Sequence, residues 1–248
     1  MLEKRAKTEH KMPIEALYLP NKGVWELFNT SQIKVASIDK TQPLDLGGFD
    51  LKAAVTKNPE NLFVKVFAIK ANEVNDNGDC FSESELQKSA HTFVGVPVFV
   101  NHQNDNVENA RGKVVHSWYD EAAKGVYCIN MVDRNAYPRL ARGIEEGYIT
   151  GTSMGAQVGF SLCSICHNKA HTAEEFCSHV KGGKNRKISG KFDCKYHASA
   201  CKPQEDCPLD GKKMSETKEL LHKEARVYEW NYDIKFIEDS FVVNPACH

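Results

Sequence analysis

The chain has 248 residues, 41% of them hydrophobic, which is enough to bury a core in one large domain or two small ones. Its 32 Lys and Arg nearly balance its 33 Asp and Glu, and a formal net charge of -1 argues against a generic nucleic-acid binder. The sequence contains no apolar run long enough to span a bilayer, and its charged N-terminus lacks the apolar core of a signal peptide. We therefore expect a cytosolic protein without a membrane partner.

Residues 1–60 are the least regular part of the sequence. They mix charged residues with prolines and the pair Gly47-Gly48, and their apolar runs are short. We interpret this stretch as a partly irregular N-terminal arm that contributes a strand or two.

A regular pattern begins after this arm. The run LFVKVFAI, residues 62–69, is rich in β-branched and aromatic residues and predicts a strand. NDNGD, residues 75–79, has the composition of a turn. Ser82 stands three residues before Glu85, which fits the capping box of a helix.

Three more strands are predicted in the middle of the chain. VPVFV, residues 96–100, is a short buried strand that leads directly into His102. Two further strands are expected at 112–120 and 125–132, with a turn near Lys124.

The second half predicts a helix and two extended segments. Asp133 can cap a helix that Gly147 would end, and residues 148–162 are extended and rich in small side chains. A last strand covers residues 232–243. Strict alternation would place five of its residues on one face: Ile234, Phe236, Glu238, Ser240 and Val242.

The segment between these two parts has a different composition. Residues 163–225 are polar, rich in lysine and full of Cys and His, and they interrupt the β-rich part before its last strand. We therefore divide the chain into the arm, a β-rich domain formed by 61–162 and 226–248, and an inserted segment at 163–225. The class expected is α+β and mostly β, with flanking helices.

Three residues in the β-rich part could form a nucleophilic site. Ser153 lies in Gly-Thr-Ser-Met-Gly, where Gly151 and Gly155 leave the hydroxyl accessible. His102 ends a strand, and Glu238 lies among apolar residues. Taken singly, each residue favours a structural role: a serine in a glycine-rich bulge, a polar strand cap and a solvated carboxylate at a strand end.

Four segments in order resemble the prohead maturation proteases of tailed bacteriophages, which are similar in fold to the herpesvirus assemblins. These segments are LFVKVFAIKANEVNDNGDCFSESELQKS, PVFVNH, LARGIEEGYITGTSMG and FIEDSFVVNPA. The resemblance implies an assemblin-like closed or partly open β-barrel. It also implies a triad of His102, Ser153 and Glu238, with Asp239 as a neighbouring alternative that alternation points to the opposite face.

The resemblance further implies a serine endopeptidase. Its substrates would be the scaffold and major capsid proteins and the chain itself, cleaved inside an assembling prohead in the host cytoplasm, and self-association is an additional expectation. His102 would take the proton of Ser153 and later protonate the leaving amine, while Glu238 would orient the imidazole. The separation of Ser153 from Glu238 is larger than is usual in the family, so the insertion must loop out between their strands.

The insertion itself has the spacing of a metal site. Cys163 and Cys166 form a CxxC pair, and Cys177 and His179 follow within a short distance. Two such pairs can complete a tetrahedron of sulfur and nitrogen ligands, for which zinc is the expected metal in a structural role. The basic residues around this group could contact phosphate or an acidic scaffold, but such a run is more often a solvated face, and we interpret it as one. These residues are Lys181, Lys184, Arg186, Lys187, Lys191 and Lys195.

A second set with looser spacing could bind another zinc ion. It consists of Cys194, His197, Cys201 and Cys207. Free cysteines in a solvated loop explain this second set equally well, so one or two structural zinc ions are expected.

Two other functions are alternatives to a protease for the same residues. A non-enzymatic zinc-binding virion or nucleic-acid module predicts that changing His102 or Ser153 has no effect. A zinc-dependent nuclease requires a metal beside His102, and the companion His and acid motifs of such a site are not evident in the sequence.

Overall fold

The computed structural model describes residues 2–7, 15–18, 45–189 and 224–242. The described strands are β1 (Leu2–Lys7), β2 (Glu15–Tyr18), β3 (Asn61–Lys70), β4 (Asp79–Phe81), β5 (Pro97–Val100), β6 (Gly112–Asp120), β7 (Gly125–Asp133), β8 (Gly151–Cys163), β9 (Lys169–Ala170), β10 (Lys187–Ser189), β11 (Glu224–Arg226) and β12 (Glu229–Val242). The helices are α2 (Leu51–Lys57), α3 (Glu83–Ser89), α4 (Pro138–Glu145) and α5 (Ser178–Lys181), with 3-10 turns η1 (Ala90–Phe93), η2 (Val107–Asn109) and η3 (Ala173–Glu175).

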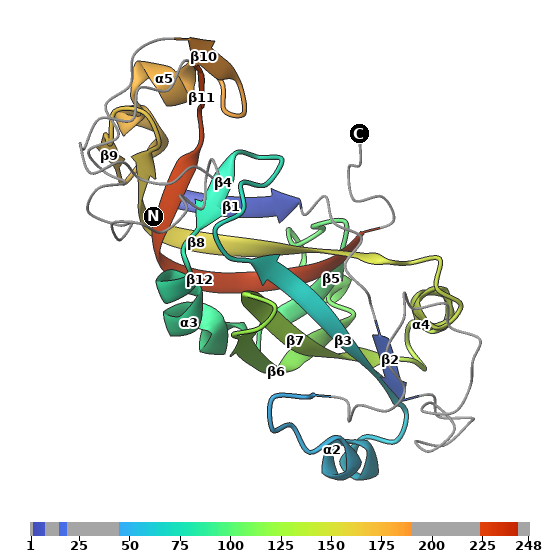
Figure 1. The fold of residues 1–248 in the computed structure, drawn as a ribbon. Helices are drawn as coiled ribbons and strands as arrows, with labels where there is room; N and C mark the ends of the chain where they lie inside the picture. Colours follow the sequence, from blue (N-terminus) through green and yellow to red (C-terminus); the bar gives the residue numbers. More distant parts are fainter. Residues whose placement is uncertain (1, 8–14, 19–44, 190–223, 243–248) are drawn as a thin grey trace.

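A ten-stranded mixed sheet dominates the fold (Figure 1). Its order is β1-β8-β12-β5-β6-β7-β3-β2, while β4 also pairs with β12 and β9 with β8. Strand β12 runs parallel to β4 and β5 and antiparallel to β8. The mostly β, α+β class is therefore confirmed.

Of the expected closed or partly open barrel, the closed form is not found in the described part of the chain. Its strands form a path with two ends, and each end strand, β1 or β2, pairs on one side only. A barrel would require a ladder between the two ends. The N-terminal arm supplies both end strands, so the arm extends the sheet at its two edges.

The strands β8 and β12 form a long ribbon that crosses the molecule, yellow beside red in Figure 1. Their ladder runs from Cys163 opposite Glu229 at one end to Gly151 opposite Val242 at the other. The segment that joins them contains β9, α5, β10 and β11, and it projects beyond the Cys163 end (Figure 1). The insertion is thus the connection of a hairpin, which explains how it can lengthen without separating the strands.

The helices follow their local signals, with one difference. Ser82 caps α3 by accepting a hydrogen bond from the backbone N–H of Glu85 at 3.3 Å, as the capping box predicts. Helix α4 begins at Pro138 and not near Asp133, which ends β7 and instead accepts the N–H of Ala136. Proline at the first helical position has no N–H to leave unpaired, and its fixed φ suits a helix start.

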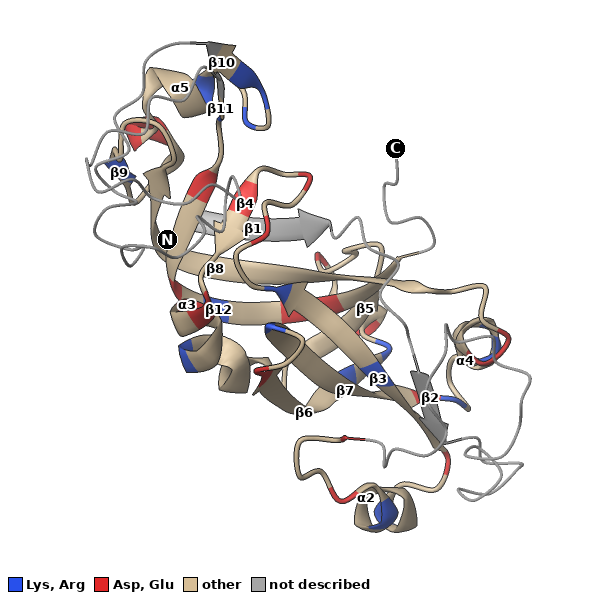
Figure 2. Cartoon of the chain, viewed as in Figure 1, with Lys and Arg blue, Asp and Glu red and all other residues tan. Residues whose placement is uncertain are grey.

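The main core lies between the sheet and α3–η1. Met154, Ala156 and Val158 of β8 are buried in it, and the ring of Phe236 on β12 stacks on Phe93 with centroids 3.7 Å apart. No helix among the described residues is long and apolar enough to cross a membrane. Acidic and basic residues are interspersed over the described elements (Figure 2), in keeping with the near-zero net charge.

Candidate active site

Three polar side chains from distant parts of the sequence meet at one end of the ribbon. His102 Nε2 lies 2.8 Å from Ser153 Oγ, and His102 Nδ1 lies 2.7 Å from Glu238 Oε1. His102 precedes Ser153 by 51 residues and Glu238 by 136. The structure thus brings together the three residues named from the sequence, in one line of hydrogen bonds.

Strand β12 is the element that makes this meeting possible. It lies between β8 and β5, so Ser240 is opposite Ser153 on one side and pairs with Phe99 on the other. Serine and glutamate therefore come from neighbouring strands, and His102 follows the end of the third. The three residues therefore meet only through the pairing of these three strands.

A strained turn carries the histidine back to the sheet. Asn101 and His102 have φ of 51° and 57°, and Gln103 N–H bonds to the carbonyl of Val100, which is the pattern of a type I′ turn. The left-handed conformation costs a non-glycine residue about 1 to 2 kcal/mol. Asn101 N–H donates to the carbonyl of Phe241 at 3.0 Å, which anchors the turn on β12.

A β-bulge, rather than simple alternation, points Glu238 toward His102. Phe236 is opposite Ala156, but Glu238 is opposite Gly155, so Ile237 is an extra residue in the ladder. An inserted residue exchanges the two faces of a strand from that point on. The expectation that Phe236 and Glu238 share a face is therefore wrong: Phe236 lies in the core, and Glu238 faces the histidine.

The same bulge sends the neighbouring acid to the core side. Asp239 is fully buried and accepts a hydrogen bond from Asn130 Nδ2 at 2.6 Å and one from the backbone N–H of Ser240 at 3.1 Å. Burial raises the pKa of Asp239 to about 6, although the hydrogen bond from Asn130 acts in the opposite direction. The two adjacent carboxylates thus occupy different environments.

Glu238 can take its position only because Gly155 has no side chain. A Cβ atom at Gly155 would lie 2.6 Å from Glu238 Cγ and 2.8 Å from its Oε1. These distances are shorter than van der Waals contact, so any larger residue would displace the carboxylate. The second glycine of the Gly-Thr-Ser-Met-Gly segment therefore makes room for the acid that bonds His102.

The site is almost closed to solvent in this conformation. Ser153 and Glu238 are each 1% exposed, and the His102 side chain is 12% exposed. Two buried atoms on this side of the sheet, Glu238 Oε2 and Ser240 Oγ, make no hydrogen bond within the described part of the chain. A polar ligand that enters the site would supply hydrogen bonds to these two atoms.

The first cysteine–histidine group also comes together. The ligand atoms of Cys163, Cys166, Cys177 and His179 all lie within 4.8 Å of one another, and Cys177 Sγ is 3.8 Å from His179 Nδ1. Tetrahedral zinc with Zn–S bonds of about 2.3 Å separates its ligands by about 3.8 Å. The four residues could therefore hold a metal ion. The second set, Cys194, His197, Cys201 and Cys207, lies outside the described residues.

The metal group and the proposed nucleophile are far apart on the ribbon. Cys163 ends β8 and Ser153 lies near its start, so ten residues of extended strand, about 33 Å, separate them. Both ring nitrogens of His102 are already bonded to Ser153 and Glu238. The metal beside His102 that a zinc-dependent nuclease requires therefore has no support here.

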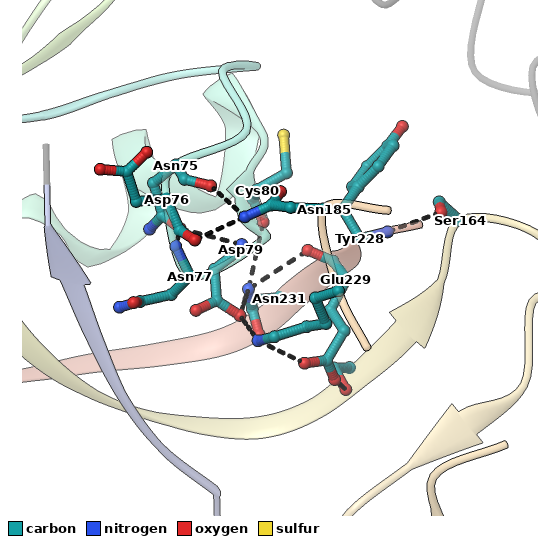
Figure 3. A network of polar contacts seen from close by, with 12 residues as sticks. Asn75, Asp76, Asn77, Asp79, Cys80, Ser164, Asn185, Tyr228, Glu229 and Asn231 are labelled. Atoms are coloured by element: carbon teal, nitrogen blue, oxygen red, sulfur yellow. Dashed lines mark hydrogen bonds and ion pairs between the residues drawn. The ribbon is translucent and has the colours of Figure 1, made fainter. Parts of the chain in front are cut away.

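A buried ion-pair network connects the insertion to the ribbon (Figure 3). Lys184 Nζ lies 2.9 Å from Asp79 Oδ1 and 2.9 Å from Glu229 Oε2, and these carboxylates are 2% and 1% exposed. Ser161 donates to Glu229, and Asn231 donates to Asp79. Burial lowers the pKa of Lys184, but the two carboxylates more than offset this, so the pKa is raised.

The loop before β4 is shaped to receive this lysine. A Cβ at Gly78 would lie 2.6 Å from Lys184 Cβ, and φ at Gly78 is 70°, so glycine suits the position in two ways. Asn185 Nδ2 donates to the backbone carbonyls of Asp76 and Asn75 (Figure 3). The view of the insertion lysines as a solvated face is therefore wrong for Lys184.

Sequence reasoning missed several of these residues for identifiable reasons. Gly155 belonged to the recognised motif, but its partner was unknown without the ladder. The bulge at Ile237 has no glycine to mark it. Lys184 stands among many lysines, and nothing in the sequence separates it from its neighbours.

Comparisons with known proteins add one finding. No protein-family model matches the sequence, and no curated protein matches it. Among solved structures, the chain is similar to the bacteriophage T4 capsid assembly protease, at 19% identity and a TM-score of 0.33, over 40% of this chain and 68% of that one. A likeness this limited does not establish a common fold, so the function has to be inferred from the site.

Proposed function

We propose that the protein is a serine endopeptidase whose nucleophile is Ser153. The observation that carries the proposal is the continuous hydrogen-bonded line from Ser153 through His102 to Glu238, with distances of 2.8 and 2.7 Å. A serine hydroxyl becomes a nucleophile when an adjacent base takes its proton and a third group orients that base. Each of the three groups is within reach of the next.

The carboxylate of Glu238 determines which nitrogen carries the imidazole proton. An ionised carboxylate accepts hydrogen bonds and donates none, so the Nδ1 of His102 must hold the hydrogen. Nε2 then presents its lone pair to Ser153 Oγ. This tautomer is the one that general-base catalysis requires.

The reaction proceeds in two acyl-transfer steps. Ser153 Oγ attacks the peptide carbonyl while its proton moves to His102 Nε2, and the imidazolium then protonates the leaving amine as the C–N bond breaks. Water next attacks the acyl-enzyme with the same histidine as base, which releases the acid product and restores Ser153. Glu238 stabilises the imidazolium in both steps.

The proposed substrates are phage scaffold and major capsid proteins and the chain itself, inside an assembling prohead in the host cytoplasm. The resemblance of the four sequence segments to prohead proteases supports this assignment. In the same proposal, Cys163, Cys166, Cys177 and His179 bind a structural zinc ion. Four protein ligands leave no open position for a reacting water, so the metal has no catalytic part.

Substitution of the nucleophile tests the enzyme. We expect Ser153→Ala to lower cleavage of denatured casein, and of the chain itself, by about 10⁴-fold or more. Mass spectrometry of new termini gives the rate, and the exposed Ser84→Ala is the matched control. Wild-type cleavage by pure Ser153→Ala protein would remove Ser153 from the mechanism.

Metal analysis tests the zinc site separately. Purified protein should contain at least one zinc per chain, and Cys166→Ser should lower that content and the melting temperature without abolishing serine-dependent cleavage in the remaining folded protein. Less than one zinc per chain, with a melting temperature unchanged by chelator, would contradict the structural role.

A further inference from the structure

The strand that carries Ser153 has two sides with different partners. Strand β12 covers one side of β8 and provides Glu238. Strand β1 covers the other side, antiparallel, from Leu2 opposite Val158 to Lys7 opposite Ser153. The N-terminal strand therefore ends directly beside the proposed nucleophile.

The two partners of β8 differ in how firmly the sheet holds them. Strand β12 is paired on both sides, with β8 on one and with β4 and β5 on the other. Strand β1 is the end of the sheet and, among the described residues, pairs with β8 alone. An edge strand with one neighbour in the sheet detaches at a lower cost than a strand that is paired on both sides. Its departure would expose a row of unpaired N–H and C=O groups along β8.

Such an edge is suited to an extended polypeptide. A peptide that adds to a sheet gains its affinity from main-chain hydrogen bonds, which tolerate many side chains. A chain aligned with β8 in the place of β1 would pass the backbone of Ser153 at the position that Lys7 now holds. Ser153 is 1% exposed in this conformation, so a neighbouring segment has to move before a substrate carbonyl can reach its hydroxyl.

We propose that the outer edge of β8, from Ser153 to Val158, is the docking edge for the polypeptide substrate, and that β1 holds this edge until it is displaced. The proposal rests on the proposed function and adds the substrate form: an extended strand, recognised mainly through its backbone, running antiparallel to β8. It also gives the N-terminal strand an autoinhibitory contact with its own enzyme.

Weakening β1 tests the proposal in the full-length chain. Adjacent residues of a strand direct their N–H groups to opposite sides, so Lys4→Pro/Arg5→Pro removes at least one donor that faces β8. We expect kcat/KM for casein cleavage to rise on the order of tenfold, because the fraction of molecules with an open edge increases. The matched control is Lys4→Ala/Arg5→Ala, which removes the same side chains but keeps the backbone N–H groups of both residues.

A binding measurement separates this proposal from the activity itself. The probe is a fluorescent peptide MLEKRAK, and the protein is Ser153→Ala lacking residues 1–7, which cannot cleave. We expect saturable binding, competition by unlabelled peptide, and loss of binding when the peptide carries proline at its fourth and fifth positions. The same peptide should inhibit the active truncated protein competitively.

The outcomes distinguish the two proposals. If casein cleavage depends on Ser153, but the proline variant is no faster than the alanine control and the peptide does not bind, the docking edge is wrong and the protease stands. If the peptide binds and no variant shows Ser153-dependent cleavage, the edge accepts a strand but the docking proposal fails together with the protease, because it requires a substrate.

Discussion

The two candidate sites lie at opposite ends of the same β8–β12 ribbon, and they are built in opposite ways. The metal group assembles from residues 163 to 179, within one connecting segment. The Ser153–His102–Glu238 line spans 136 residues and needs three strands and a bulge. The comparison shows that local spacing suffices for a metal knuckle, whereas a hydrogen-bonded triad depends on the register of the whole sheet.

The two ends also differ in how they treat charge. At the metal end, the cation of Lys184 pairs with two buried carboxylates, Asp79 and Glu229. At the other end, Glu238 bonds a histidine, and Asp239 is buried against an amide with a raised pKa. Buried polar atoms without a hydrogen bond among the described residues occur at both ends, Asn75 Nδ2 and Asn231 Oδ1 at the first and Glu238 Oε2 and Ser240 Oγ at the second. The difference between the ends is therefore the partner of the buried acids, a lysine at one end and a histidine at the other.

After Ser153 itself, the largest effect expected is at Glu238. Glu238→Gln keeps the size of the side chain but removes the charge that holds the Nδ1–H tautomer, so kcat should fall by about 10⁴-fold while the fold persists. Casein cleavage measures the fall in kcat, and circular dichroism checks that the fold persists. Asp239→Asn serves as the adjacent control and should stay near the wild-type rate. Equal losses in both variants would contradict the different roles of the two acids.

At the metal end, the comparison predicts a loss of stability. Lys184→Met leaves two buried carboxylates without their cation, so the free energy of unfolding should fall by about 3 to 5 kcal/mol. Urea denaturation measures this, with the exposed Lys57→Met as control. Adding Glu229→Gln to Lys184→Met should restore part of the loss, because one uncompensated charge is removed. A Lys184→Met protein as stable as the control would show that the network contributes little.

The buried acid predicts a pH dependence of stability. Burial raises the pKa of Asp239 to about 6 in the folded protein, whereas in the unfolded chain its pKa has the ordinary value of 3.8. The folded state thus binds more protons in this window, and its contribution to stability falls as pH rises, by about 3 kcal/mol in total. Asp239→Asn should flatten this part of the profile and be more stable than wild type at pH 7. An unchanged profile between pH 4 and 6 would assign the dependence to other groups.

The smallest effect expected is at Gly155. Gly155→Ala introduces a methyl group 2.6 Å from Glu238 Cγ, so we expect the free energy of unfolding to fall by about 1 to 3 kcal/mol and kcat to fall more than KM rises. In a Glu238→Gln background the same change should cost little further activity, because the carboxylate it displaces is absent. Additive losses in kcat would mean that Gly155 acts on something other than Glu238.

Much of the local structure could be predicted from particular residues. The β-branched run at 62–69 forms β3, and Ser82 with Glu85 caps α3. The CxxC pair at 163 and 166 meets Cys177 and His179 as its spacing suggests. Each of these features depends on neighbours a few residues apart, which is the range over which propensity, capping and chelation act.

The remaining features could not be predicted from the sequence, because each of them is a contact between segments that are far apart along the chain. Alternation alone put Glu238 on the face of Phe236, and only the bulge opposite Gly155 reversed this. Lys184 is a partly buried ion because the loop at Gly78 and two buried acids pack against it, which its neighbours in sequence do not indicate. The edge strand β1 beside Ser153 could not be foreseen either, since strand pairing between residues 2–7 and 153–158 leaves no local signal. Residue type and local spacing indicate which residues could do chemistry, whereas the long-range register of the sheet determines which of them meet.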